Sequence, residues 1–278
     1  MGNTTKKANY ILFACLTFLL ILFLVPILLV LMNSFKGQLF ISNTPFEFPN
    51  VESFYGIDNY VNGVQKIDFF RAFGYSLFIT VFSVAAIVLF TSMTAWYITR
   101  VKSKITTALY YLFVFSMVVP FQMVMYTMVK VANTLQLDNP IGLIVIYLGF
   151  GAGLSVFMFS GFIKSVPVDI EESAIIDGCN PLQTFFLIVF PILRPTAITV
   201  AILNTMWIWN DFLLPYLVIG TKLRTIPIAI QYLQGGYGSR DMGALMAMLV
   251  LSIIPIIIFY LTCQKHIIKG VLSGAVKG

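Results

Sequence analysis

Long apolar stretches separated by short charged segments dominate the hydrophobic pattern of the chain. Each stretch is free of charged residues, except that the fifth contains Asp211. A helix needs about 20 residues to cross ~30 Å of hydrocarbon. Because lipid offers no hydrogen-bond partners, each backbone amide must be satisfied within its own segment, which favours helices. We therefore expect six transmembrane helices, at about 10–32, 74–98, 106–129, 140–163, 195–219 and 243–264.

The composition supports a membrane protein. Hydrophobic residues make up 59% of the chain and charged residues only 10%, whereas about 25% of the residues in soluble domains are charged. We expect an all-α membrane protein in which residues 1–278 form one transmembrane domain. The first apolar stretch is longer than the 7–15 residue core of a signal peptide, so we expect it to be retained as an anchor.

The distribution of basic residues predicts the orientation in a bacterial cell membrane. With six spans, both termini lie on the same side as the short 99–105 loop, which carries Arg100, Lys102 and Lys104 and no acid. The positive-inside rule therefore predicts cytoplasmic termini. The net charge of +6 is then explained by topology and lipid headgroups, without a nucleic-acid partner.

The cytoplasmic connection between the fourth and fifth spans is too elaborate for a simple linker. Acidic residues near its start complement the positive end of a helix dipole, and Gly178 can end that helix in the left-handed conformation. Asn180 and Pro181 form a typical N-cap and first helical position. We expect a second helix from there to the residue before Pro191, so that 167–191 is a helix–turn–helix.

This connection also carries a sequence motif. Glu172-Ser173-Ala174, three residues, Gly178, nine residues and Ile188-x-Phe190-Pro191 resemble the EAA loop of binding-protein-dependent ABC import permeases, with consensus E-A-A-x3-G-x9-I-x-L-P. The chain departs from it at Ser173 and Phe190. The Asp177-Gly178 pair and the Pro191…Pro195 pair are similar to the carbohydrate branch, the maltose-type permeases.

The resemblance implies that this loop docks onto an ATPase subunit and relays its closure to the transmembrane helices. The alternative is an amphipathic hairpin that lies on lipid, although its acids would be repelled by anionic headgroups. By resemblance, the coupling residues are Glu171, Glu172, Ser173, Ala174, Asp177, Gly178, Ile188 and Pro191.

The resemblance also implies the partners: a second permease chain, two ATPase chains, an extracytoplasmic solute-binding protein and a sugar. ATP and magnesium would be bound by the ATPase, because this chain has no G-x4-G-K-[ST] motif. We expect no enzymatic activity and no cofactor on this chain. His266 has no neighbouring histidine or cysteine, so no metal site is expected.

Polar and aromatic residues in the fifth span form a candidate substrate path. Intramembrane charge is costly and indicates function, and tryptophan stacks well on the apolar face of a sugar. The Trp-Asn-Asp-Phe string is similar to the fifth span of sugar permeases. The alternative is an aromatic belt at the outer interface. The candidate path residues are Asn204, Trp207, Asn210 and Asp211.

The last outer loop contains Gly235, Gly236, Tyr237 and Gly238. Three glycines in four residues allow close approach to another surface. In maltose-type relatives the matching loop contacts the binding protein, which the resemblance implies here. The alternative is an ordinary loop turn.

Two other functions remain open. A gradient-driven secondary carrier would need intramembrane carboxylates, and this chain offers only Asp211. An importer of a non-sugar solute, such as a polyol phosphate, would favour Arg or Lys inside a span, and no predicted span interior has one.

Overall fold

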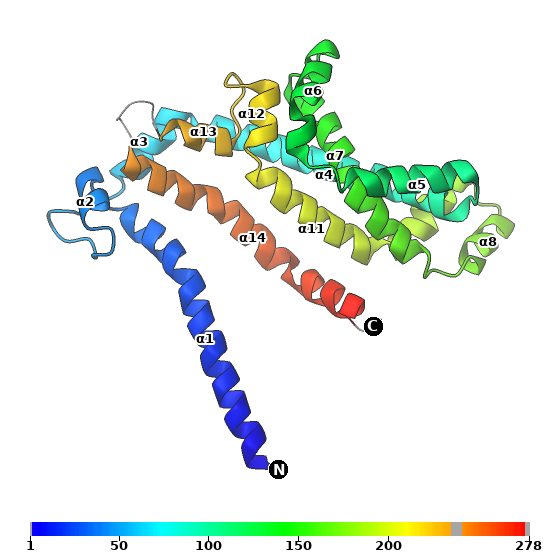
Figure 1. Cartoon of the computed structure of the whole chain (residues 1–278), viewed down its shortest axis with the longest axis horizontal. Helices are drawn as coiled ribbons and strands as arrows, with labels where there is room; N and C mark the ends of the chain where they lie inside the picture. The colour runs from blue at the N-terminus through cyan, green and yellow to red at the C-terminus, as the bar shows by residue number, and fades with distance from the viewer. Residues whose placement is uncertain (1, 235–240, 276–278) are drawn as a thin grey trace. The chain divides into compact units, whose positions relative to one another are not determined.

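The computed structural model describes residues 2–234 and 241–275, and these residues are almost entirely helical (Figure 1). The chain divides into two compact units. Unit 1 comprises residues 1–70 and 229–255, and unit 2 comprises residues 71–228 and 256–278. The single transmembrane domain expected from the sequence stays a prediction.

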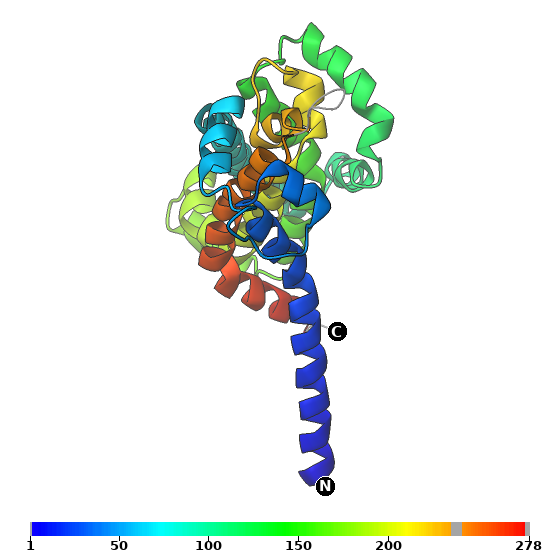
Figure 2. The same ribbon diagram turned by 90° about the vertical axis from the view of Figure 1, so that its left-hand side faces the viewer.

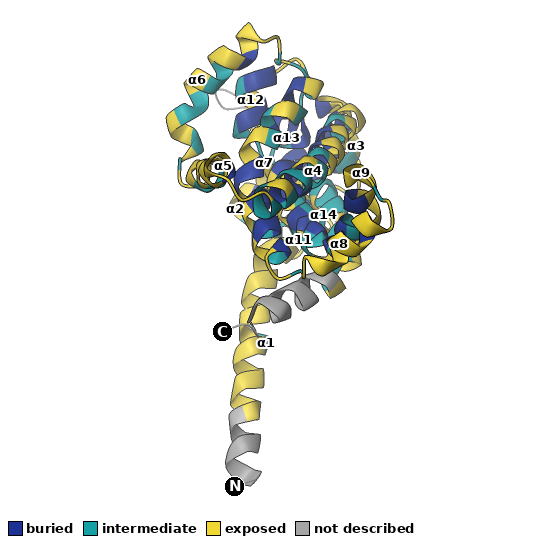
Figure 3. Cartoon of the chain, turned by 90° about the vertical axis from the view of Figure 1, so that its right-hand side faces the viewer, coloured by how far each residue is buried: buried dark blue, intermediate teal, exposed yellow. Residues whose placement is uncertain are grey.

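Unit 1 begins with a long apolar helix, α1 (Gly2–Asn33), which Figure 2 shows uninterrupted along its length. Its described side chains are mostly exposed, as Figure 3 shows; Phe13, for example, is 70% exposed. A continuous apolar surface of this kind suits lipid or another membrane helix rather than water. The unit also contains α2 (Gln38–Asn43), α3 (Asp58–Ile67) and the first part of α14 (Met242–Ala275).

Polar side chains hold the segment after α1 together. The Asn59 side chain donates hydrogen bonds of 2.9 Å to the carbonyls of Ser34 and Lys36. Lys36 is fully buried, and its ammonium group donates a 2.8 Å bond to the Thr44 carbonyl. That carbonyl lies at the C-terminal end of α2, where a cation is favourable.

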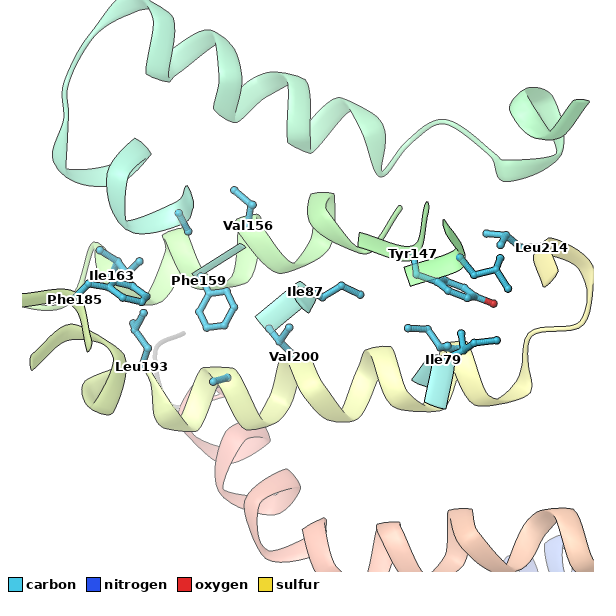
Figure 4. Close-up of a cluster of buried hydrophobic side chains, with 14 of the residues drawn as sticks. Ile79, Ile87, Tyr147, Val156, Phe159, Ile163, Phe185, Leu193, Val200 and Leu214 are labelled. Atoms are coloured by element: carbon cyan, nitrogen blue, oxygen red, sulfur yellow. The ribbon is translucent and has the colours of Figure 1, made fainter. Parts of the chain in front are cut away.

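Unit 2 is a helical bundle around one apolar core. Buried side chains from several of its segments meet in this core, among them Ile87, Phe159, Phe185 and Val200 (Figure 4). Its segments are α4 (Phe69–Arg100), α5 (Lys104–Ser116), α6 (Phe121–Thr134), α7 (Pro140–Ile163), α8 (Asp169–Ile176), α9 (Pro181–Gln183), a π-helix (Thr184–Val189), α10 (Phe190–Ile192), α11 (Arg194–Asn210) and α12 (Leu213–Ile219). Helix α13 (Ile226–Tyr232) is divided between the units.

Four of the described helices are long and apolar enough to cross a membrane. The number rises to six when each of two bent pairs counts as one span, namely α5 with α6, and Pro181–Ile192 with α11. The predicted spans 10–32, 74–98, 140–163 and 243–264 lie within the continuous helices α1, α4, α7 and α14. The chain is therefore an all-α membrane protein.

The other two predicted spans are interrupted. Segment 106–129 is divided into α5 and α6, which bend by 109°. Pro120 is the extended N-cap of α6, since proline lacks an N–H and disfavours helix at the preceding residue. Segment 195–219 breaks at Asp211, where the backbone is extended between α11 and α12. The exact bounds of these two spans stay predictions.

Candidate functional site

The predicted helix–turn–helix is present in unit 2. Helix α8 opens with three acids and ends at Ile176, after which Gly178 adopts the left-handed conformation with φ of +86°. A Cβ atom at Gly178 would meet nothing within 4 Å, so the turn is open to its surroundings. Asn180 caps the next helix through a reciprocal capping box with Gln183. The turn chemistry was readable from the sequence.

The second helix does not stop before Pro191, contrary to our expectation. After α9 the chain forms a π-helix and then α10, which includes Pro191. The Phe190 N–H bonds to the Phe185 carbonyl, five residues back. In a regular α-helix proline clashes with the carbonyl four residues earlier, and the wider π-turn changes that register. The helix bends by 76° only after Ile192, where α11 begins.

Glu171 lies buried and bonded within this chain. Its Oε1 accepts from Nε and Nη2 of Arg100 at 2.9 and 2.6 Å, and its Oε2 accepts from the indole N–H of Trp96 at 2.8 Å. Arg100 Nη2 also donates to the Val166 carbonyl at 3.0 Å. Both oxygens of the Glu171 carboxylate are thus hydrogen-bonded to residues at the end of α4.

The remaining predicted coupling residues differ in exposure. Ala174 is buried, so its small side chain permits close packing inside the chain rather than against another surface. Ile188 is half-buried. The exposed members are Glu172, Ser173, Asp177, Gly178 and Pro191. Apolar side chains flank them, with Ile175 62%, Ile176 85% and Leu182 60% exposed.

The candidate path residues are only partly brought together. Trp207 packs edge-on against Tyr147, with ring centroids 5.4 Å apart, and the Tyr147 hydroxyl donates a 3.0 Å hydrogen bond to Asp211. Asn204 is buried against α7, where its amide lies 3.3 Å from the Ser155 hydroxyl. Asn210 is exposed and its amide bonds back to a carbonyl of its own helix.

Sequence reasoning missed three residues of these sites. Trp96 and Arg100 occupy one face of the last turn of α4, and Tyr147 is a hydroxyl-bearing aromatic within an apolar span. A tyrosine or tryptophan within an apolar stretch usually has a polar partner for its O–H or N–H group. This was the sequence signal available for Tyr147 and Trp96. The predicted binding-protein contact, Gly235–Gly238, lies outside the described residues.

Comparison with known proteins identifies the family. Residues 87–273 match the family described as binding-protein-dependent transport system inner membrane component. The chain is 38% identical to the multiple sugar-binding transport system permease protein MsmG of Streptococcus mutans, covering 98% of this chain and 99% of MsmG. It is 30% identical to the melibiose/raffinose/stachyose import permease protein MelC of Bacillus subtilis, covering 91% of each.

The fold also matches a solved structure of a bacterial ABC transporter that imports the acidic polysaccharide alginate. The TM-score is 0.79 at 18% identity, and the match covers 95% of this chain and 97% of that one. The sequence match to the family model spans most of the chain, from the middle of α4 into α14. The chain therefore belongs to the family of binding-protein-dependent transport system inner membrane components.

Proposed function

We propose that this chain is the permease subunit of an ATP-driven importer for a sugar or oligosaccharide. The names of MsmG and MelC refer to sugar transport, and both proteins align with nearly the whole chain. The alginate importer adds a saccharide transporter with the same fold. An extracytoplasmic binding protein delivers the substrate, and a second permease chain completes the path.

The ATPase partners bind the loop between α7 and α11. The observation that carries this role is the open turn at Gly178, flanked by exposed apolar side chains on both sides. Within the described residues, no ion pair neutralises the exposed carboxylates of Glu172 and Asp177. A partner cleft with basic residues and an apolar floor would complement this surface through charge-assisted hydrogen bonds.

The ATPase supplies the energy and this chain supplies the path. ATP and magnesium are bound by two ATPase subunits on the cytoplasmic side, where both termini of this chain also lie. Closure of the ATPases moves the loop and opens the path outward, and hydrolysis resets it. Asn204, Trp207, Asn210 and Asp211 line the path, and Gly235–Gly238 contacts the binding protein.

A gradient-driven carrier is the weaker alternative. Such carriers couple transport to intramembrane ionisable groups, and Asp211 is the single acid in the predicted interior of a span. A polyol-phosphate importer is also weaker, since phosphate recognition favours arginine or lysine in the path.

The test is purification of the tagged chain from its host in mild detergent, followed by reconstitution in liposomes. We expect an ATPase, a second permease chain and a solute-binding protein to co-purify. Uptake of the binding protein's sugar should require ATP inside the liposomes. Purification of the chain alone, with uptake driven by an ion gradient and no ATP, would overturn the proposal in favour of the carrier.

A further inference from the structure

We infer that Arg100 and Trp96 are positioning residues that make the coupling loop, residues 167–191, move as one body with α4. Glu171 then acts inside this chain, and its neighbour Glu172 faces the ATPase. This inference rests on the proposed function and identifies which helix receives the movement of the loop.

The first argument is the environment of Glu171. Its side chain is 8% exposed and that of Arg100 is 17% exposed. Both carboxylate oxygens already accept hydrogen bonds, three in all, from Arg100 and Trp96. Hydrogen bonds between charged groups are short and strong. A carboxylate bonded in this way has few free acceptor positions for a partner protein.

The second argument is what the end of α4 holds. Trp96 and Arg100 are four residues apart and so lie on one face of the helix. Arg100 binds Val166, in the connection from α7, as well as Glu171 in α8. The Trp96 ring packs 5.5 Å from the ring of Phe185 in the π-helix. One helical turn therefore holds the start and both halves of the loop.

The third argument is where α4 leads. In sequence the loop lies between α7 and α11, so these two helices are the obvious recipients of its movement. Near its opposite end, however, α4 contacts Trp209 through Phe73, with ring centroids 5.8 Å apart. The Ser76 hydroxyl accepts a 2.8 Å bond from the Ile226 N–H. Displacement of the loop thus reaches the α11 end that carries Asp211 through α4 as well.

The test compares variants in the reconstituted complex with its ATPases and binding protein. Glu171→Gln removes the charge, and Trp96→Phe keeps the ring on Phe185 but removes the indole N–H. We expect both to retain the ATPase at wild-type levels. We also expect the sugar transported per ATP hydrolysed to fall about tenfold for Glu171→Gln, which corresponds to the loss of one charge-assisted bond, and less for Trp96→Phe.

Two further variants separate positioning from mere stability. Glu172→Gln should instead weaken retention of the ATPase, and Glu52→Gln, an exposed acid of unit 1, should change neither readout. The exchange Arg100→Glu with Glu171→Arg should recover part of the lost coupling, because it restores an ion pair. Misfolding alone would reduce the yield of complex without changing the ratio of sugar to ATP.

Two results would overturn the inference while leaving the proposed function intact. One is a wild-type ratio of transport to hydrolysis in both Glu171→Gln and Arg100→Met. The other is loss of the ATPase from Glu171→Gln as severe as from Glu172→Gln, which would mean that Glu171 contacts the ATPase directly. Absence of any ATPase from the wild-type complex would instead contradict the proposed function itself.

Discussion

The Tyr147 hydroxyl donates a hydrogen bond to Asp211 Oδ2 across 64 residues of sequence. The bond joins the first half of α7 to the break between α11 and α12, where Asp211 Oδ1 also accepts from the Leu214 N–H at 3.4 Å. Trp207 packs against the same tyrosine ring. An acid fixed on both oxygens beside a tryptophan forms a defined polar position, unlike an acid free in water at an interface.

This arrangement predicts the effect of changing Asp211 in transport assays. If Asp211 lines the path, Asp211→Asn should raise the KM for the sugar about tenfold, the size expected for one hydrogen bond to a charged group. ATP hydrolysis in the absence of binding protein should not change. Tyr147→Phe should raise KM less, because it removes only the group that orients the acid. Unchanged uptake at all sugar concentrations in Asp211→Asn would favour the aromatic-belt interpretation.

The turn at Gly178 gives a second prediction, with a control glycine elsewhere in unit 2. Gly178 and Gly220 both have positive φ, +86° and +61°, and open space where a Cβ would stand. Aspartate at either position is strained, and at Gly220 the ψ of −137° adds to the strain because only glycine commonly adopts that region. Gly220→Asp therefore controls for backbone strain, and the thermal midpoint of each variant shows how large that strain is. Gly178→Asp should lose the ATPase at least tenfold and Gly220→Asp should retain it. Equal retention, measured by co-purification, would contradict the docking assignment.

Close packing in α7 predicts a stability difference among its glycines. A Cβ at Gly153 would come within 2.8 Å of the Phe113 carbonyl in α5, whereas a Cβ at Gly149 would meet nothing within 4 Å. Gly153→Ala should therefore destabilise the helix pair by about 1–3 kcal/mol through overpacking. Gly149→Ala should have little effect. The thermal midpoint in detergent measures both, and equal midpoints would contradict the packing argument.

Asp241 predicts a pH effect in unit 1. Partial burial favours its neutral form, but hydrogen bonds from Lys66 and the Ala244 N–H outweigh this and lower the pKa of Asp241. A lowered pKa means that its stabilising effect is present above the unfolded pKa of about 4 and is lost as the pH falls through the folded value. Asp241 also caps α14.

The variants of Asp241 should separate the two interactions. Asp241→Asn keeps an N-cap but loses the ion pair, which is partly exposed and contributes less than about 1 kcal/mol. Asp241→Ala loses both and should cost about 1 kcal/mol more. The fall of the thermal midpoint on acidification should become smaller in Asp241→Asn. An identical pH profile in wild type and Asp241→Asn would exclude Asp241 as its source.

Local chemistry in the sequence predicted the turn of the 167–191 helix–turn–helix, but not where its second helix ends. Gly178 and the Asn180-Pro181 pair specify the turn and the cap through backbone geometry alone, so no distant residue is needed to recognise them. The Arg100–Glu171 pair could not be found in this way, because its members are 71 residues apart. The sequence explained Arg100 by the positive-inside rule and Glu171 by the helix dipole. Neither explanation required the two residues to be partners.

The interrupted spans show a second limit of the sequence pattern. Hydropathy averages over a window, so it detects an apolar stretch but not the direction of the chain within it. Pro120 lies between α5 and α6, but a proline alone does not fix the 109° angle between these helices. At Asp211 the carboxylate competes with the helix by bonding the Leu214 N–H.

The π-helix Thr184–Val189 determines how a change in the length of the coupling loop would reorient α11. A π-turn holds one residue more than an α-turn, so deleting one residue here would leave an ordinary α-helix. The extra residue is absorbed within one turn, so this first deletion would leave the direction of α11 nearly unchanged. A second deletion, from the α-helix that remains, would rotate everything after it by about 100° relative to α8. The face of α11 that carries Trp207 would then point away from Tyr147. The π-turn thus allows the spacing between Gly178 and Pro191 to shorten by one residue without changing the angular phase of α11, but not by two.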